Sequence, residues 1–136
     1  MYMDLFNEFL TGDDTLQVYE HCTLVYSSEK DRLLPLLEYI DGLSGNPPQV
    51  VILDKVIGNA AALLCVIANC REVYSPLGSQ LAVRTLDKYG IKYHFSETVP
   101  YIQQPSKEMC PMEKLSLEKT PEEFHETMRG LIKQED

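Results

Sequence analysis

The chain has 136 residues, 44% of them hydrophobic, so it can bury one sizeable core and is expected to fold as a single domain, residues 1–136. Twelve basic and 21 acidic residues give a formal charge of −9, which disfavours nucleic acids and anionic membranes as partners, because both bind through surplus Lys and Arg. No apolar run reaches the roughly 18 residues that cross a bilayer, and the first residues lack the basic start of a secretion signal, so a cytoplasmic location is expected.

The chain begins with helix and strand patterns. Residues 1–15 include a short helical segment whose apolar side chains fall on one side. Residues 15–27 are rich in Val, Tyr, Leu and Thr, which indicates either one long strand or a hairpin that bends near residues 20–21. Residues 27–42 then predict a helix, which the glycine at its end would stop.

Strands and helices alternate in the middle of the chain. The strand VVILD (50–54) is typical of the centre of a parallel sheet, and the apolar helix after it (59–70) is expected to be buried on several sides. Two short strands, 72–75 and 91–95, flank a helix that Ser79 is expected to cap. Right-handed crossovers between such strands predict a three-layer α/β/α sandwich with a mainly parallel, mixed sheet.

The remainder of the chain is less regular. Residues 96–109 contain two prolines and no clear period, so they are expected to form a long loop or partly a strand. A helix is expected to start at Cys110. The last helix, 120–134, has a clear start, because Thr120 and Glu123 have the spacing of a capping box.

Two strand-to-helix junctions, DKVIGNAAA (54–62) and YSPLGSQ (74–80), are the expected ligand site, because ligands bind beyond the carboxyl ends of such strands. Gly58 lets the backbone approach a ligand, and the amides that follow it carry a partial positive charge to which Lys55 could add a full one. A phosphate or carboxylate would suit this setting. The alternative is that Gly58 and Asn59 only start the helix. The candidate ligand-binding residues are Lys55, Gly58, Asn59, Ser75 and Ser79.

Two residues are candidates for catalysis. Asp54 ends a strand, where a carboxylate can act as a general base, and it should point away from its neighbour Lys55. Cys110 precedes a proline at a helix start, where the helix dipole lowers a thiol pKa. No histidine lies nearby in sequence to act as its base, so a structural role stays open.

No metal or cofactor is expected. The four cysteines lack zinc-site spacing and are expected to be free thiols, and the three histidines are not paired with other ligands. His125 is expected to be solvated on an acidic surface helix. The chain also lacks the common phosphate-binding, dinucleotide-binding, serine-hydrolase and zinc-protease motifs.

Four words of the sequence resemble a small prokaryotic family, domain of unknown function 1893. They are DKVIGNAAALL, EVYSPLGSQLAVRTLDKYGIKYHF, VPYI and CPMEKL, and the similarity runs from about Gln17 to Leu115, without the amino-terminal segment and the last helix. The resemblance implies a cytidine deaminase-like fold for residues 16–115. It implies no activity, because none is established for the family.

The zinc chemistry of deaminases is nevertheless not expected. Zinc deaminases place H-x-E or C-x-E at one helix start and P-C-x-x-C at the next. The corresponding words here are GNAAA and SPLGSQ, which supply neither a metal ligand nor the proton-shuttling Glu. Cys65 lies about two turns into its helix, too deep to replace a ligand at the site.

Three hypotheses about function follow. The first is a metal-free, deaminase-like pocket that binds a small, nucleotide-like or other anionic ligand. The second is a zinc-free enzyme in which Cys110 acts as thiolate, Asp54 or Lys55 assists, and residues 99–109 form a lid. The third is an interaction module, for which a homodimer is one arrangement.

Overall fold

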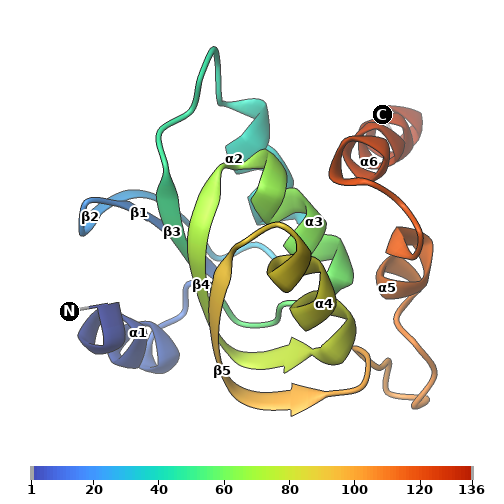
Figure 1. Cartoon of the computed structure of the whole chain (residues 1–136), viewed down its shortest axis with the longest axis horizontal. Helices are drawn as coiled ribbons and strands as arrows, with labels where there is room; N and C mark the ends of the chain where they lie inside the picture. Colours follow the sequence, from blue (N-terminus) through green and yellow to red (C-terminus); the bar gives the residue numbers. More distant parts are fainter. Residues whose placement is uncertain (1, 136) are drawn as a thin grey trace.

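A computed structural model describes residues 2–135, with side chains as far as Leu131. Over these residues the protein is an α/β protein with a five-stranded mixed sheet and six helices (Figure 1). The elements are α1 (Tyr2–Thr11), β1 (Leu16–Glu20), β2 (Thr23–Ser28), α2 (Leu34–Asp41), β3 (Val50–Asp54), α3 (Asn59–Ile67), β4 (Cys70–Ser79), α4 (Gln80–Lys88), β5 (Lys92–Val99), α5 (Pro111–Ser116) and α6 (Pro121–Glu135).

The strand order across the sheet is β2-β1-β3-β4-β5. Strand β1 runs antiparallel to both of its neighbours, whereas β3, β4 and β5 are parallel to one another. Helix α3 connects β3 to β4, and α4 connects β4 to β5, as parallel neighbours require. The carboxyl ends of the three parallel strands therefore point the same way.

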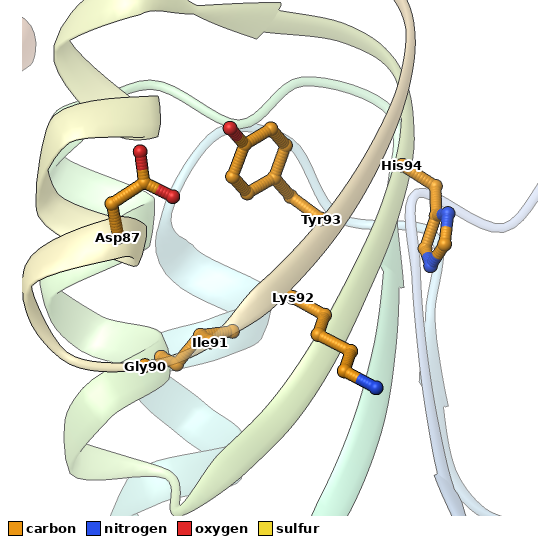
Figure 2. Close-up of a pocket in the computed structure, with 6 residues that line it drawn as sticks. All are labelled: Asp87, Gly90, Ile91, Lys92, Tyr93 and His94. Atoms are coloured by element: carbon orange, nitrogen blue, oxygen red, sulfur yellow. The ribbon is translucent and has the colours of Figure 1, made fainter.

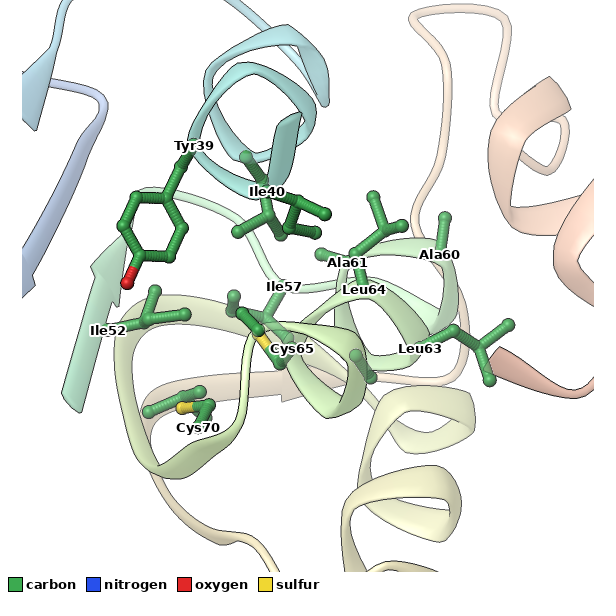
Figure 3. Close-up of a cluster of buried hydrophobic side chains, with 14 of the residues drawn as sticks. Tyr39, Ile40, Ile52, Ile57, Ala60, Ala61, Leu63, Leu64, Cys65 and Cys70 are labelled. Carbon is green, nitrogen blue, oxygen red and sulfur yellow. The ribbon is translucent and has the colours of Figure 1, made fainter. Parts of the chain in front are cut away.

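Helices pack on both faces of the sheet because the first four residues of β3, 50–53, are all apolar and buried. Val50 and Ile52 point toward a large cluster with α2, α3, α4 and α6, part of which Figure 3 shows around Ile52, Leu64 and Cys65. Val51 and Leu53 point to the other face, where α1 contributes aromatic side chains. Side chains continue to alternate after Leu53, so Asp54 is directed toward the face covered by α3 and Lys55 toward the face covered by α1.

The β1–β2 segment is a hairpin, which was one of the two arrangements that the sequence left open. His21 and Cys22 have φ angles of 49° and 65° and form the two-residue turn between the strands. Two consecutive left-handed residues match the twist of an antiparallel pair.

Two strands are longer, and two helices shorter, than predicted. β4 continues to Ser79 through the predicted strand-to-helix junction, and β5 continues to Val99 into the stretch expected to be a loop or partly a strand. The two extensions pair with each other, Leu77 with Glu97 and Ser79 with Val99. β2 continues to Ser28, and helix α2 begins only at Leu34, with Pro35 in its first turn. Helix α3 ends at Ile67, and Asn69, with φ at 60°, turns the chain into β4.

Helices α5 and α6 pack against α3 (Figure 1). The capping box at the start of α6 is confirmed, because Thr120 N donates to Glu123 Oε1 at 2.9 Å and Glu123 N donates to Thr120 Oγ1 at 3.1 Å. His125 is half-buried rather than solvated, and its Nε2 has no hydrogen-bond partner. None of the helices described between residues 2 and 135 has the length and apolarity of a membrane span.

Candidate functional site

The two predicted junctions lie side by side. Beyond β3, Ile57 bridges to Gly78 in parallel: its N–H donates to the carbonyl of Leu77 at 2.9 Å, and its carbonyl accepts from Ser79 N at 3.1 Å. Gly78 permits this pairing beside the Phe95 ring, since a Cβ there would lie only 2.2 Å from Phe95 Cδ2. The start of α3 and the end of β4 are thus fixed to each other.

A cavity of about 550 Å³, here called the strand-end cavity, opens beside the corner between β3 and α3. Its walls come from Thr15 and from parts of three stretches, 31–33, 54–61 and 102–113. Asp54, Gly58 and Cys110 all line it, so the structure brings together candidates that lie more than fifty positions apart in the sequence. The small side chains after Gly58 leave the space that larger ones would fill.

Asp54 is the buried acid of this cavity. It is 9% exposed, and its Oδ1 accepts from the Val56 amide at 3.4 Å. Burial raises its pKa to about 8, against the lowering effect of the Val56 and Lys55 amides. At neutral pH the group is therefore mainly a neutral carboxylic acid, which can both donate and accept a hydrogen bond.

The raised pKa predicts a pH dependence of stability that Asp54→Asn should remove. Between the ordinary value of 3.8 and about 8, folded Asp54 holds a proton that the unfolded chain has released, so stability falls as pH rises. This group alone contributes a slope of up to roughly 1.4 kcal/mol per pH unit. Urea unfolding at pH 5, 6.5 and 8 should show a flatter dependence for Asp54→Asn. Asp13→Asn, at an exposed position, should keep the wild-type slope, and equal slopes for all three proteins would contradict the assignment.

Glu113, and not an external anion, occupies the start of α3. This side chain is 1% exposed; its Oε1 accepts from the Asn59 amide and its Oε2 accepts from the Ile102 amide at 2.7 Å. A carboxylate in this position is stabilised by the positive end of the helix dipole. Glu113 belongs to the first turn of α5, but its carboxylate caps α3 and ties the 102–113 stretch to the start of that helix.

Asn59 joins three helices rather than facing the cavity. Its Nδ2 donates to Ser116 Oγ at 2.9 Å and to the Ser116 carbonyl at 3.3 Å, and its Oδ1 accepts from Thr85 Oγ1. The buried amide group is thereby used within the chain. Asn59 was either to bind a ligand or only to start the helix. Its contacts within the chain favour the structural role at the helix start.

Lys55 diverges from Asp54, as strand alternation predicts. Lys55 lines the cavity, but its Nζ donates to the carbonyls of Phe9 at 2.8 Å and Gly12 at 3.3 Å and lies 4.4 Å from the centroid of the Phe9 ring. Carbonyls at a helix end attract a cation. The ammonium charge therefore holds the end of α1 and is directed away from the Asn59 amide.

Neither serine candidate lines the strand-end cavity. Ser75 Oγ donates to the Leu77 carbonyl at 2.9 Å, and Ser79 Oγ accepts from Ala82 N at 3.0 Å, which confirms Ser79 as the cap of α4. Both side chains are buried. Their hydroxyls stabilise the end of β4 and its turn into α4.

Cys110 precedes α5 and is half-buried in the cavity wall. Its N–H donates to the Ile102 carbonyl at 2.8 Å, and its carbonyl accepts from Lys114 N at 3.0 Å, whereas its thiol makes no cap bond. Cys110 and Ile102 thus close the base of the loop between them. Cys110 lines the same cavity as Asp54.

Arg32 is a cavity residue that the sequence analysis missed. It lies at the exposed rim with a left-handed φ of 61°, and among the described residues it forms no ion pair. The restriction that Pro35 places on the helix start was the available signal that the residues before it form a loop. Ile102 and Glu113 gave no local signal, since their contacts are made across the fold.

A second hollow, of about 460 Å³, lies along the start of β5 (Figure 2). Its lining includes Asp87, Lys92 and His94. His94 Nε2 lies 2.8 Å from Glu72 Oε2, and its ring stacks on Tyr74 with the centroids 4.3 Å apart. His94 is thus engaged with its neighbours on an open strand surface, so this hollow is the weaker candidate.

Metal ligands do not gather at either place. Within residues 2–135, no three His, Cys, Asp or Glu side chains lie close enough together to hold an ion. The cysteines of this region are free thiols, with Cys65 and Cys70 buried in the core.

Comparison with known proteins supplies the family. A model of a domain of unknown function, DUF1893, matches residues 5–132. The chain belongs to the DUF1893 family. This DUF1893 match is longer than the stretch from Gln17 to Leu115 noted in the sequence, and it includes most of α1 and α6, which that stretch left out.

A solved DUF1893 structure has the same fold. The crystal structure of a DUF1893 family protein from Thermotoga maritima superposes with a TM-score of 0.84 at 25% sequence identity, covering 95% of this chain and 88% of that chain. No curated protein matches the sequence.

Proposed function

We propose that this DUF1893 protein binds a small ligand in the strand-end cavity. The observation that carries the proposal is the cavity itself, which places a buried acid, Asp54, and an exposed cation, Arg32, around about 550 Å³ of space. Cavities of this size beyond parallel strands are the usual place for ligands in α/β proteins. Part of the proposal is that the protein acts in the cytoplasm, where free thiols stay reduced.

We also propose that the protein is a deaminase-like three-layer sandwich that lacks the zinc chemistry of deaminases. Helices on both faces of the sheet, and the crossovers α3 and α4 between parallel strands, support such a sandwich. The words GNAAA and SPLGSQ lie at the paired junctions. A pocket that binds without hydrolysing is the function that fits these junctions.

The ligand's anionic group, where it has one, would bind at the rim and not at α3. Glu113 already uses the Asn59 amide, and its charge repels a second anion there. Arg32 lines the cavity at an exposed position, and its guanidinium is a group that suits phosphate or carboxylate. A nucleotide-like ligand would then lie with its ring inside and its phosphate outside.

Thermal melting against a panel of nucleotides and sugar phosphates tests this proposal. At a hundred times its Kd, a ligand should stabilise the protein by about 2.7 kcal/mol. Arg32→Ala should weaken binding of phosphate-bearing ligands about tenfold, since it removes a charge-assisted hydrogen bond. Arg84→Ala, an exposed change on α4, is the matched control and should leave binding unchanged. A panel in which no ligand raises the melting temperature would contradict the proposal.

A zinc-free enzyme is the second candidate, because Cys110 and Asp54 line the same cavity. An activated Cys110 should react with iodoacetamide at neutral pH faster than a free peptide thiol. The measurement needs a Cys22→Ser background, since Cys22 is exposed. A rate no faster than that of the peptide would exclude an activated thiolate.

The third hypothesis, an interaction module with a homodimer as one arrangement, stays a prediction. Leu24 and Val25 on the edge strand β2 are 46% and 47% exposed, and this edge is the surface proposed for it. Sedimentation over a range of concentrations measures the oligomeric state.

A further inference from the structure

The polar groups of the strand-end cavity differ in what they leave available to a ligand. Both oxygens of Glu113 accept amide N–H groups, and the ammonium of Lys55 is held by carbonyls of α1. Asp54 accepts only from backbone amides, and no side chain among the described residues donates to it. It is therefore the inner group with hydrogen-bonding capacity to spare.

We propose that Asp54 acts as a neutral carboxylic acid that pairs with a neutral, planar ligand group in which an N–H lies beside a C=O, as in a cyclic amide or urea. This inference rests on the proposed binding function and adds the chemical class of the ligand. The acid O–H donates to the ligand carbonyl, and the acid carbonyl accepts from the ligand N–H. Two parallel hydrogen bonds then satisfy both groups in a buried place.

The wall beside Asp54 suits a flat ring. Gly58, Ala60 and Ala61 line the cavity with no side chain or with a single methyl group. A Cβ at Gly58 would lie 2.9 Å from both Glu113 Oε1 and Ile102 Cγ1, so this wall is already closely packed. The space beside Gly58 is therefore filled by Glu113 and Ile102, and the single methyl groups of Ala60 and Ala61 leave the room for a planar ligand.

Charged ligand groups fit less well beside Asp54, at what is here called the inner end of the strand-end cavity. An anion there would face Glu113, and a cation would require Asp54 to lose its proton in a buried position, which costs desolvation energy. A neutral partner avoids both costs. The ionisable groups around Asp54 are Asp31, Arg32, Lys55, Cys65, Cys110 and Glu113.

Three small planar probes with one six-membered ring test the ligand class: 2-pyridone is a neutral cyclic amide, benzoate an anion and benzamidine a cation. Binding is measured by calorimetry and by amide chemical shifts at pH 6.5 and pH 9.5. We expect 2-pyridone to bind at pH 6.5 and to bind about 30-fold more weakly at pH 9.5, because Asp54 loses its proton near pH 8. Benzoate and benzamidine should bind the inner end at neither pH.

Variants separate this inference from the proposed function. Asp54→Asn keeps a hydrogen-bond donor beside an acceptor and should bind 2-pyridone without the pH dependence. Asp54→Leu has neither group and should not bind 2-pyridone. The control variant, Asp13→Asn, should behave as wild type. Binding of benzoate or benzamidine in the cavity without 2-pyridone would overturn the ligand class and leave the site intact. If neither these probes nor the nucleotide panel binds, the proposed function fails as well.

Discussion

Replacing Glu113 by alanine is expected to lower the free energy of unfolding by about 3 to 4 kcal/mol. The change leaves the amides of Asn59 and Ile102 without their acceptor, in a place where Glu113 is 1% exposed. Each buried donor without a partner costs about 1 to 3 kcal/mol, and the interaction with the α3 dipole is also lost. The 102–113 stretch would lose its attachment to the strand-end cavity.

Urea unfolding at pH 7 measures this effect as a change in midpoint at constant slope. Glu113→Gln is a partial control, because it keeps one acceptor oxygen but turns an NH₂ group toward an amide donor, and about half of the loss is expected. Glu126→Ala, at an exposed position of α6, should stay within about 0.5 kcal/mol of wild type. A loss below about 1 kcal/mol for Glu113→Ala would contradict its role.

Gly78→Ala is expected to cost about 3 kcal/mol. The added Cβ would lie 2.2 Å from Cδ2 and 2.6 Å from Cγ of Phe95, so a rigid ring on the neighbouring strand has to move. Ile57 pairs with Gly78, and a shift of β4 here would also displace the corner that begins α3. The change should therefore disturb the strand-end cavity as well as stability.

A double-mutant cycle isolates the cause of the Gly78→Ala effect. In a Phe95→Ala background the ring is gone, and Gly78→Ala should then cost less than about 1 kcal/mol. Gly130→Ala is the matched control, since a Cβ there meets nothing within 4 Å and alanine favours the helix. An equal cost for Gly78→Ala with and without Phe95 would show that the ring contact is not responsible.

The sequence predicted the alternation of strands and helices around an apolar core, and the two strand-to-helix junctions, because these features depend on local patterns. An apolar β3, the Ser79 cap and the α6 capping box each depend on residues within a few positions of one another. Alternation along β3 also predicted that Asp54 and Lys55 diverge. The choice between a hairpin and a single strand near residues 20–21 stayed open, because the turn contains no glycine. Its two left-handed residues are His21 and Cys22.

The cavity could not be predicted, because its walls come from distant stretches. Glu113 meets Asn59 across 54 positions, and nothing near Glu113 distinguishes it from an ordinary first-turn acid. Lys55 was predicted to add positive charge to an anion site. Its actual partners, the carbonyls of Phe9 and Gly12, lie more than forty positions earlier in the chain and gave no local signal. β4 extends past its predicted end because β5 supplies the hydrogen bonds, which no propensity within SPLGS indicates.

Amide chemical-shift mapping on ¹⁵N-labelled protein tests the location of the binding site most directly. The titrant is 2-pyridone, followed by whichever nucleotide of the panel raises the melting temperature most. The shifts should concentrate at Asp54–Ala61 and Ile102–Glu113, around the strand-end cavity. No shifts with any titrant, or shifts confined to the hollow at Asp87–His94 in Figure 2, would contradict the account.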